Sequence, residues 1–72
     1  MKTFTLADKH GNKTRFTVKA ESDVCQIENF DRDGRSMGWP FTTNVHGGRC
    51  EYRKSVSKFG MVPVNAPNGS ER

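Results

Sequence analysis

The chain has 72 residues, a formal net charge of +4 and a pI near 9.4. A chain of this length buries only about 60% of its unfolded surface, which limits it to one domain and leaves little room for the concave pocket of an enzyme. Only 32% of the residues are hydrophobic, and Phe and Val, which suit strands better than helices, are the commonest of them. The composition therefore predicts one small, β-rich, non-enzymatic domain.

The N-terminal segment does not match a secretory signal. Threonines interrupt the apolar run in residues 1–7, and the charged pair Asp8 and Lys9 ends it. No run approaches the roughly 20 apolar residues of a membrane-spanning helix. We therefore expect a cytoplasmic protein without membrane contact, in which the cysteines stay reduced.

The basic and acidic residues fall into three blocks along the chain. Residues 1–20 and residues 35–60 each hold five basic residues and one acidic residue, whereas residues 21–34 hold five acidic residues and one basic. This order fits a nucleic-acid surface that is assembled from two segments. It fits equally well a set of cross-strand ion pairs on a solvated face, which is the commoner arrangement and the one that we favour.

The clearest structural signal is a strict alternation near the N-terminus. Apolar and polar residues alternate on both sides of a Gly-containing loop at residues 8–12. The pattern predicts a β-hairpin that pairs residues 3–7 with residues 14–19. One face of this hairpin shows threonines and basic residues such as Arg15. The other face is predicted to be buried, and it carries Phe4, Leu6, Phe16 and Val18.

The middle of the chain is predicted to hold two further strands. Residues 22–30 form the third strand in this interpretation. A short helix at 22–31 is the alternative, because a capping residue precedes apolar residues at helical spacing. A turn signal at 31–34 then leads into a strand at 35–41. Pro40 lacks a backbone donor, so this strand is predicted to be an edge or to be interrupted there.

One more long strand and a short one are predicted before a polar C-terminal tail. Residues 44–48 read as a loop because their Gly-Gly pair tolerates positive φ. Residues 49–57 alternate as a strand, and residues 59–64 give a short edge strand. Residues 65–72 have nothing to bury and are predicted to be disordered, which leaves 1–64 as a single β-rich domain. The strand at 49–57 would place on one face Cys50, Tyr52 and Val56.

Five short strands at this spacing predict a mainly β fold. We expect a small five-stranded antiparallel sheet, strongly bent or closed into a barrel of the SH3-like or OB-like kind. An antiparallel sheet with one short helix at 22–31 is the alternative. Because a scaffold this small usually needs a staple or a partner, a homo-oligomer is kept open.

Cysteine and histidine are the residues that could bind a metal or react. The spacing of His46 and Cys50 suits a shared metal, but Cys25 and His10 are isolated in the sequence, so we expect no metal and no cofactor. Cys50 with His46 as its base also lacks a third group to orient the imidazole, so we expect no catalytic residue. A Cys25–Cys50 disulfide requires neighbouring strands and an oxidising compartment. We therefore expect both cysteines to be free thiols.

The most informative stretch is residues 35–41, which combines the single Trp with Phe, Met and Arg. Trp and Arg are enriched at interface hot spots, and aromatic rings beside basic residues stack on single-stranded bases. Because Gly38 and Pro40 flank Trp39, we expect part of this ring to be exposed. The alternative is that Trp39 completes a poor core. The candidate binding residues are Arg35, Trp39, Phe41, Arg49, Tyr52 and Arg53.

Two binding functions follow from these residues. The favoured one is a protein-binding regulator or inhibitor, of the accessory type carried by phages and mobile elements. It would act on a host or cognate protein, nucleic-acid machinery included, through charged faces and Trp39 as an anchor. The alternative is a nucleic-acid-binding module in which Trp39 and Tyr52 stack beside basic residues. In that module the segment at 21–34 would have to point away from the phosphates.

Overall fold

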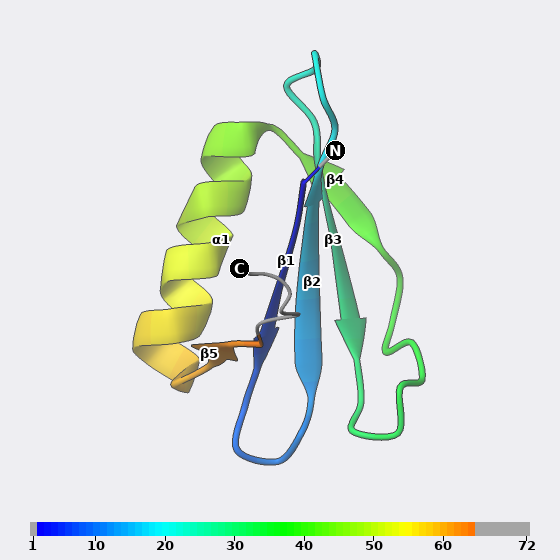
Figure 1. Ribbon diagram of the computed structural model, residues 1–72, viewed down its shortest axis with the longest axis vertical. Coiled ribbons are helices and arrows are strands. Elements are labelled where there is room, and N and C mark those ends of the chain that lie inside the picture. Colours follow the sequence, from blue (N-terminus) through cyan, green and yellow to red (C-terminus); the bar gives the residue numbers. More distant parts are fainter. Residues whose placement is uncertain (1, 65–72) are drawn as a thin grey trace.

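The computed structural model describes residues 2–64, so the predicted disordered tail at 65–72 lies outside the described part of the chain. Figure 1 shows the strands side by side with a helix packed against one side of them. The elements, in chain order, are β1 (Lys2–Ala7), β2 (Lys13–Val18), β3 (Cys25–Phe30), β4 (Phe41–Thr43), α1 (Val45–Phe59) and β5 (Val62–Pro63).

The strands form one five-stranded antiparallel sheet in the order β4-β3-β2-β1-β5. This arrangement confirms the predicted small, mainly β fold. The sheet is open rather than closed into a barrel, with β4 and β5 at its two edges. The predicted edge strand near the C-terminus is therefore present as β5, which pairs with β1.

The first two strands form the predicted hairpin. Their register pairs Phe4 with Phe16 and Leu6 with Thr14. Leu6 and Phe16 are buried as predicted. Phe4 is 46% exposed and Val18 is half-buried, although both lie on the face of the sheet that α1 covers.

Asp8 fixes the loop between β1 and β2. Its carboxylate accepts hydrogen bonds from the backbone N–H of His10 at 2.8 Å, from the backbone N–H of Asn12 at 2.9 Å and from the Asn12 side-chain amide at 3.2 Å. Desolvation acts to raise the pKa of Asp8, but the hydrogen bonds and the neighbouring His10 outweigh it and lower this pKa from its usual value of 3.8. The charged form of Asp8 is therefore the one that stabilises the loop.

The middle of the chain is a strand, as favoured, and the alternative helix at 22–31 is wrong. β3 pairs with β2 in a register that places Ile27 opposite Phe16. Cys25 and Ile27 both point into the core and are buried. The alternation of apolar and polar residues along β3 therefore decides its structure over the capping signal that precedes it.

The segment after β3 is largely a loop, which corrects the predicted strand at 35–41. It opens with the predicted turn, in which the Asp31 carboxylate accepts hydrogen bonds from two backbone N–H groups of the loop, each at 2.9 Å. An isolated bridge at Ser36 is followed by irregular backbone. Pro40 has no donor to offer, and regular pairing resumes only at β4, an edge strand.

The largest difference from the sequence prediction is α1, because residues 49–57, predicted as a strand, lie inside this helix. The helix begins after Asn44, whose side-chain oxygen accepts a hydrogen bond from the Gly47 N–H at 2.7 Å. It ends at Gly60, which adopts the left-handed conformation with a φ of 64°. Both ends thus carry the residue types that commonly cap helices.

Gly48 allows α1 to approach β3 closely. A Cβ atom at position 48 would lie 2.5 Å from the Sγ atom and 2.9 Å from the Cβ atom of Cys25, so only Gly fits. A Gly inside a helix is less favourable than Ala by about 1 kcal/mol, and the packing against Cys25 offsets this loss. Burial in this contact raises the pKa of the Cys25 thiol.

The core lies between α1 and one face of the sheet. Tyr52 of α1 packs onto it, with its ring centroid 5.5 Å from that of Phe16 and 6.5 Å from that of Phe4. The buried hydroxyl of Thr14 donates a hydrogen bond to the side-chain oxygen of Asn29 at 2.8 Å, so it is satisfied. The buried apolar residues are Leu6, Phe16, Cys25, Ile27 and Met61.

Candidate functional site

The side of the sheet that faces away from α1 is the candidate site. Successive side chains of a strand point to opposite faces, so the burial of Leu6, Phe16 and Ile27 against α1 sends their neighbours to the other side. Within residues 2–64, no helix or strand packs on that side (Figure 1). We name this set the open face; it comprises Thr3, Thr5, Ala7, Lys13, Arg15, Thr17, Gln26, Glu28, Phe30 and Thr42.

The open face is arranged in cross-strand rows. The central row runs from Thr5 through Arg15 to Glu28. The row on one side of it holds Thr3, Thr17, Gln26 and Thr42, and the row on the other side holds Ala7, Lys13 and Phe30. The face therefore offers hydroxyl, amide and cationic groups, with Glu28 as the one carboxylate within the set.

Arg15 occupies the centre of the open face in a fixed position. Its Nη2 atom donates a hydrogen bond to Oε1 of Glu28 at 2.7 Å, directly across the β2–β3 pair. Its guanidinium carbon lies 4.8 Å from the centre of the Phe30 ring, which is a cation–π contact. Although it is held on two sides, the Arg15 side chain remains 44% exposed, so its other N–H groups are free to bind.

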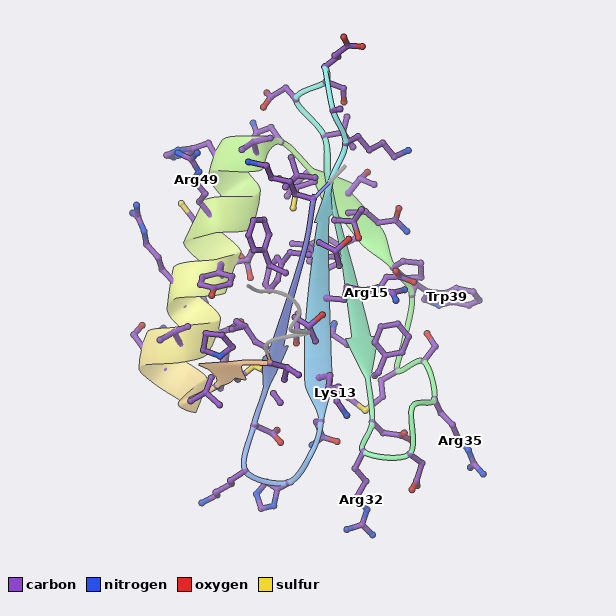
Figure 2. The ribbon with its side chains drawn as sticks, viewed as in Figure 1. Lys13, Arg15, Arg32, Arg35, Trp39 and Arg49 are labelled. Atoms are coloured by element: carbon purple, nitrogen blue, oxygen red, sulfur yellow. The ribbon has the colours of Figure 1, made fainter. Side chains whose placement is uncertain are left out.

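The loop between β3 and β4 presents Trp39 and two arginines. Trp39 is 90% exposed, which confirms that its ring is not part of the core. It follows Gly38, whose φ of 74° turns the chain outward. Figure 2 shows Trp39 and Arg35 projecting on the side of the molecule that lies away from α1. Arg32 lies in the same loop and is also exposed.

The structure separates the six residues that the sequence groups into one binding surface. Arg35 and Trp39 share the β3–β4 loop, and Phe41, 47% exposed, follows at the start of β4. Arg49 and Arg53 are both exposed on α1, and Figure 2 shows Arg49 on the other side of the sheet from Trp39. The predicted strand at 49–57 is wrong, because this segment is helical, and so these two arginines do not join Arg35 on the sheet.

Tyr52 has a structural position rather than a free one. It is half-buried between α1 and the sheet and contacts Phe4 and Phe16. The nucleic-acid hypothesis expects this ring to stack on a base beside Arg53, but its position in the core contact makes it unavailable for stacking.

Lys13 and Arg15 are the functional candidates that sequence reasoning did not select. The alternation that predicts the hairpin already assigns Arg15 to the polar face. What the sequence does not reveal is that this face stays uncovered, because that depends on which side of the sheet α1 packs.

The histidine and cysteine side chains do not form a larger cluster. The Sγ atom of Cys50 lies 3.8 Å from Nε2 of His46, since the two residues are one helical turn apart on the exposed side of α1. Cys25 is buried on the other side of the helix, and both thiols are free. Among the described residues, no three His, Cys, Asp or Glu side chains come together as metal ligands would.

A groove of about 220 Å³ lies on the α1 side, near the C-terminal end of the helix. Its lining includes the apolar residues Phe41, Phe59 and Met61 and the polar residues Asn29 and Glu51. Ligand pockets in proteins usually have volumes of about 300–1,000 Å³, so this groove is small for a substrate site.

None of the helical structure described at residues 2–64 has the length and hydropathy that crossing a bilayer requires. Comparison of the chain with protein-family models, with curated proteins and with solved structures finds no match.

Proposed function

We propose that this protein is a small, non-enzymatic nucleic-acid-binding module that uses the open face as its contact surface. The observation that carries the proposal is an uncovered, polar sheet face with a fixed Arg15 at its centre and a solvent-exposed Trp39 on the same side of the molecule, away from α1. Hydrogen-bonding and cationic groups supply contacts to bases and phosphates, and the exposed ring supplies a flat apolar surface for a base or a sugar.

The distribution of acidic groups supports this proposal. The acidic residues of the segment at 21–34 do not form one surface, because the segment runs from the β2–β3 loop through β3 to the next loop. Asp23 accepts a hydrogen bond from the backbone of Val45, and Asp31 accepts two from its own loop. Glu28 is paired with Arg15. Much of the acidic character is thus engaged within the protein, and the net charge of +4 favours an anionic partner.

The experiment measures binding of a fluorescent oligonucleotide at several salt concentrations. Lys13→Ala/Arg35→Ala removes two positive charges from the side of the open face. The matched control, Arg53→Ala/Lys58→Ala, removes two from α1. Each phosphate contact contributes about 0.9 to the slope of log K against log salt, so the first variant should lower this slope by about two units while the control leaves it unchanged. A protein that binds no oligonucleotide at low salt would contradict the proposal, and so would a loss confined to the α1 variant.

A protein-binding regulator, the function that the sequence favours, has its own supporting observation. Phe59 is 66% exposed at the end of α1, and Phe41, which is 47% exposed, borders the same groove. Exposed apolar side chains that lie together are typical of protein-binding surfaces. Phe59→Ser tests this second candidate. It should abolish capture of a protein partner and leave oligonucleotide binding intact, whereas unchanged capture would contradict it.

A further inference from the structure

The open face has a feature that binding to phosphates alone does not need, namely an ion pair at its centre. Resting on the proposed function, we propose that the open face binds the major groove of duplex DNA and that the Arg15–Glu28 pair reads a G·C base pair there.

The side chains that rise from β2 and β3 on the open face suit the width of the major groove. The two strands lie about 4.8 Å apart, and the major groove of B-form DNA is about 12 Å wide, so these side chains can reach the bases while the flanking strands β1 and β4 face the two phosphate backbones. β2 and β3 carry the central side chains of the open face, Arg15, Thr17, Gln26 and Glu28. β1 lies alongside, where the hydroxyls of Thr3 and Thr5 can donate hydrogen bonds to the phosphate backbone.

The Arg15–Glu28 pair matches the edge of a G·C base pair. Guanine presents two acceptors in the major groove, and cytosine presents an amino donor beside them. Arg15 uses Nη2 for Glu28 and retains further N–H donors for guanine. Oε1 of Glu28 accepts from Arg15, and its other oxygen remains for the cytosine amino group. Donor and acceptor thus stand side by side across β2 and β3, as they do on the base pair.

The position of Glu28 argues against simple phosphate binding at the centre of the face. A carboxylate 2.7 Å from the guanidinium repels a phosphate that approaches the same arginine. A base-pair edge carries donors as well as acceptors, so it tolerates the carboxylate. The contact with Phe30 further limits the motion of Arg15, which reduces the entropy lost when it binds a base.

The same geometry selects DNA over RNA. The major groove of an A-form RNA duplex is too narrow and deep for side chains on a sheet to reach the bases. Single strands lack a groove that could hold β2 and β3 in register with a base pair. Duplex DNA is therefore the substrate class that the open face fits.

The experiment first selects bound sequences from a random duplex DNA library. It then measures the affinity of the protein for the selected duplex and for the same duplex with the G·C pair changed to A·T. The matching RNA duplex and each single strand are measured in the same way. The wild-type protein should enrich a G·C pair at one fixed position. Changing that pair should weaken binding by about 5- to 150-fold, which corresponds to the discrimination of a bidentate contact.

Two conservative variants assign the selection to the ion pair. Arg15→Lys keeps the charge and loses the planar fork, so it should weaken the preference for the G·C pair by a larger factor than it weakens binding to random duplex DNA. Glu28→Gln removes the carboxylate with little change of shape and should likewise weaken the preference. Circular dichroism melting of both variants checks that they are folded.

The remaining outcomes overturn the inference in distinguishable ways. Equal affinity for all nucleic acids, with Glu28→Gln tightening each of them, would show a phosphate-binding surface, and the proposed function would stand without the reading of a base pair. Tighter binding to RNA or to a single strand would also overturn it, as would a preference that both variants retain. Binding to no nucleic acid would remove the proposed function itself.

Discussion

Two surfaces of this protein are basic, and they differ in how their charges are held. On α1 the exposed cations lie on long side chains, and the Lys54–Glu51 ion pair is loose, at 3.5 Å. On the open face, Arg15 is fixed by Glu28 at 2.7 Å and by the Phe30 ring. A fixed cation loses less side-chain entropy on binding, whereas a mobile one mainly adds long-range attraction. The comparison teaches that charge count alone does not mark a binding surface.

The α1 surface carries more positive charge than the open face but lacks its order. Its exposed basic residues are Arg49, Arg53, Lys54 and Lys58. Because this surface lies across the sheet from the open face, we expect it to make no direct phosphate contact and to contribute little to the salt dependence of binding. The open face should instead determine how long the complex lasts.

The largest expected effect comes from weakening the core packing between the sheet and α1. Phe16 lies on β2 next to Arg15 in sequence and packs against Tyr52 of α1, with ring centroids 5.5 Å apart. Phe16→Ala leaves a cavity at this contact and should lower the free energy of unfolding by about 3–5 kcal/mol. Urea unfolding followed by circular dichroism measures the loss. A variant that unfolds at nearly the same urea concentration as the wild-type protein would show that the two layers do not depend on this side chain.

The next largest effect is a loss of DNA affinity with no loss of stability. Trp39→Ala removes a ring that is 90% exposed, so the melting temperature should hardly change. Affinity for DNA should fall by about 2 kcal/mol, roughly thirtyfold, if the ring is an anchor of the site. Phe59→Ala is the matched control, because Phe59 is also an exposed aromatic, 66% exposed, but on α1. Equal losses in both variants would mean that the two surfaces cannot be distinguished by their aromatic residues.

A smaller effect tests the contact that attaches α1 to the sheet. Gly48→Ala adds a methyl group that meets Cys25, and such overpacking destabilises by about 1–3 kcal/mol. Ala is also a better helix former by about 1 kcal/mol, so we expect a net loss of about 1 kcal/mol. Ser57→Ala, at an exposed position of the same helix, provides the control and should be neutral or stabilising. If Gly48→Ala were the more stable protein, the close approach would not be a constraint.

The smallest expected effect is a dependence on pH at the β1–β2 loop. The pKa of Asp8 is lower in the folded protein than in the unfolded chain, so its contribution is complete above the unfolded value near 3.8. That contribution is lost as the pH falls through the lower, folded value. Asp8→Asn should therefore flatten the stability profile in this acidic range and leave the profile at neutral pH with the same shape. Thermal melts between pH 2 and about 7 measure this profile; identical acid profiles for both proteins would contradict the prediction.

The sequence predicts the strands whose alternation is uninterrupted. The hairpin of β1 and β2 and the inward side chains Cys25 and Ile27 of β3 all follow from a period of two. The turn that Asp31 fixes follows from residue types that favour turns. In each case the local signal and the tertiary contacts agree.

The sequence does not predict α1, because the face of this helix that packs on the sheet lacks a continuous stripe of apolar residues. The positions that meet the sheet include Gly48 and Ser55, which interrupt the stripe that Tyr52 would continue. A Gly-Gly pair is an ordinary loop signal, and nothing local shows that Cys25 lies beneath it. The available signals were the ends of the helix, Asn44 and Gly60, which a search for capping residues could have found.

The sequence predicts only part of the candidate site, because the rest depends on where α1 packs. Exposure of Trp39 follows from its Gly and Pro neighbours, and the structure confirms it. The grouping of Arg49 and Arg53 with Arg35 depends on a strand at 49–57, whereas the structure has a helix there. The choice of Arg15 required the position of the helix, since either face of a sheet can in principle be covered.

The different exposure of the two thiols allows this protein to be labelled at a single site for spectroscopy. Cys25 is sealed beneath Gly48, whereas Cys50 is exposed on α1. A maleimide dye should therefore label one position without any engineered substitution. That position lies across the sheet from the open face, so the dye would report the slower tumbling of a complex without standing in the way of its formation.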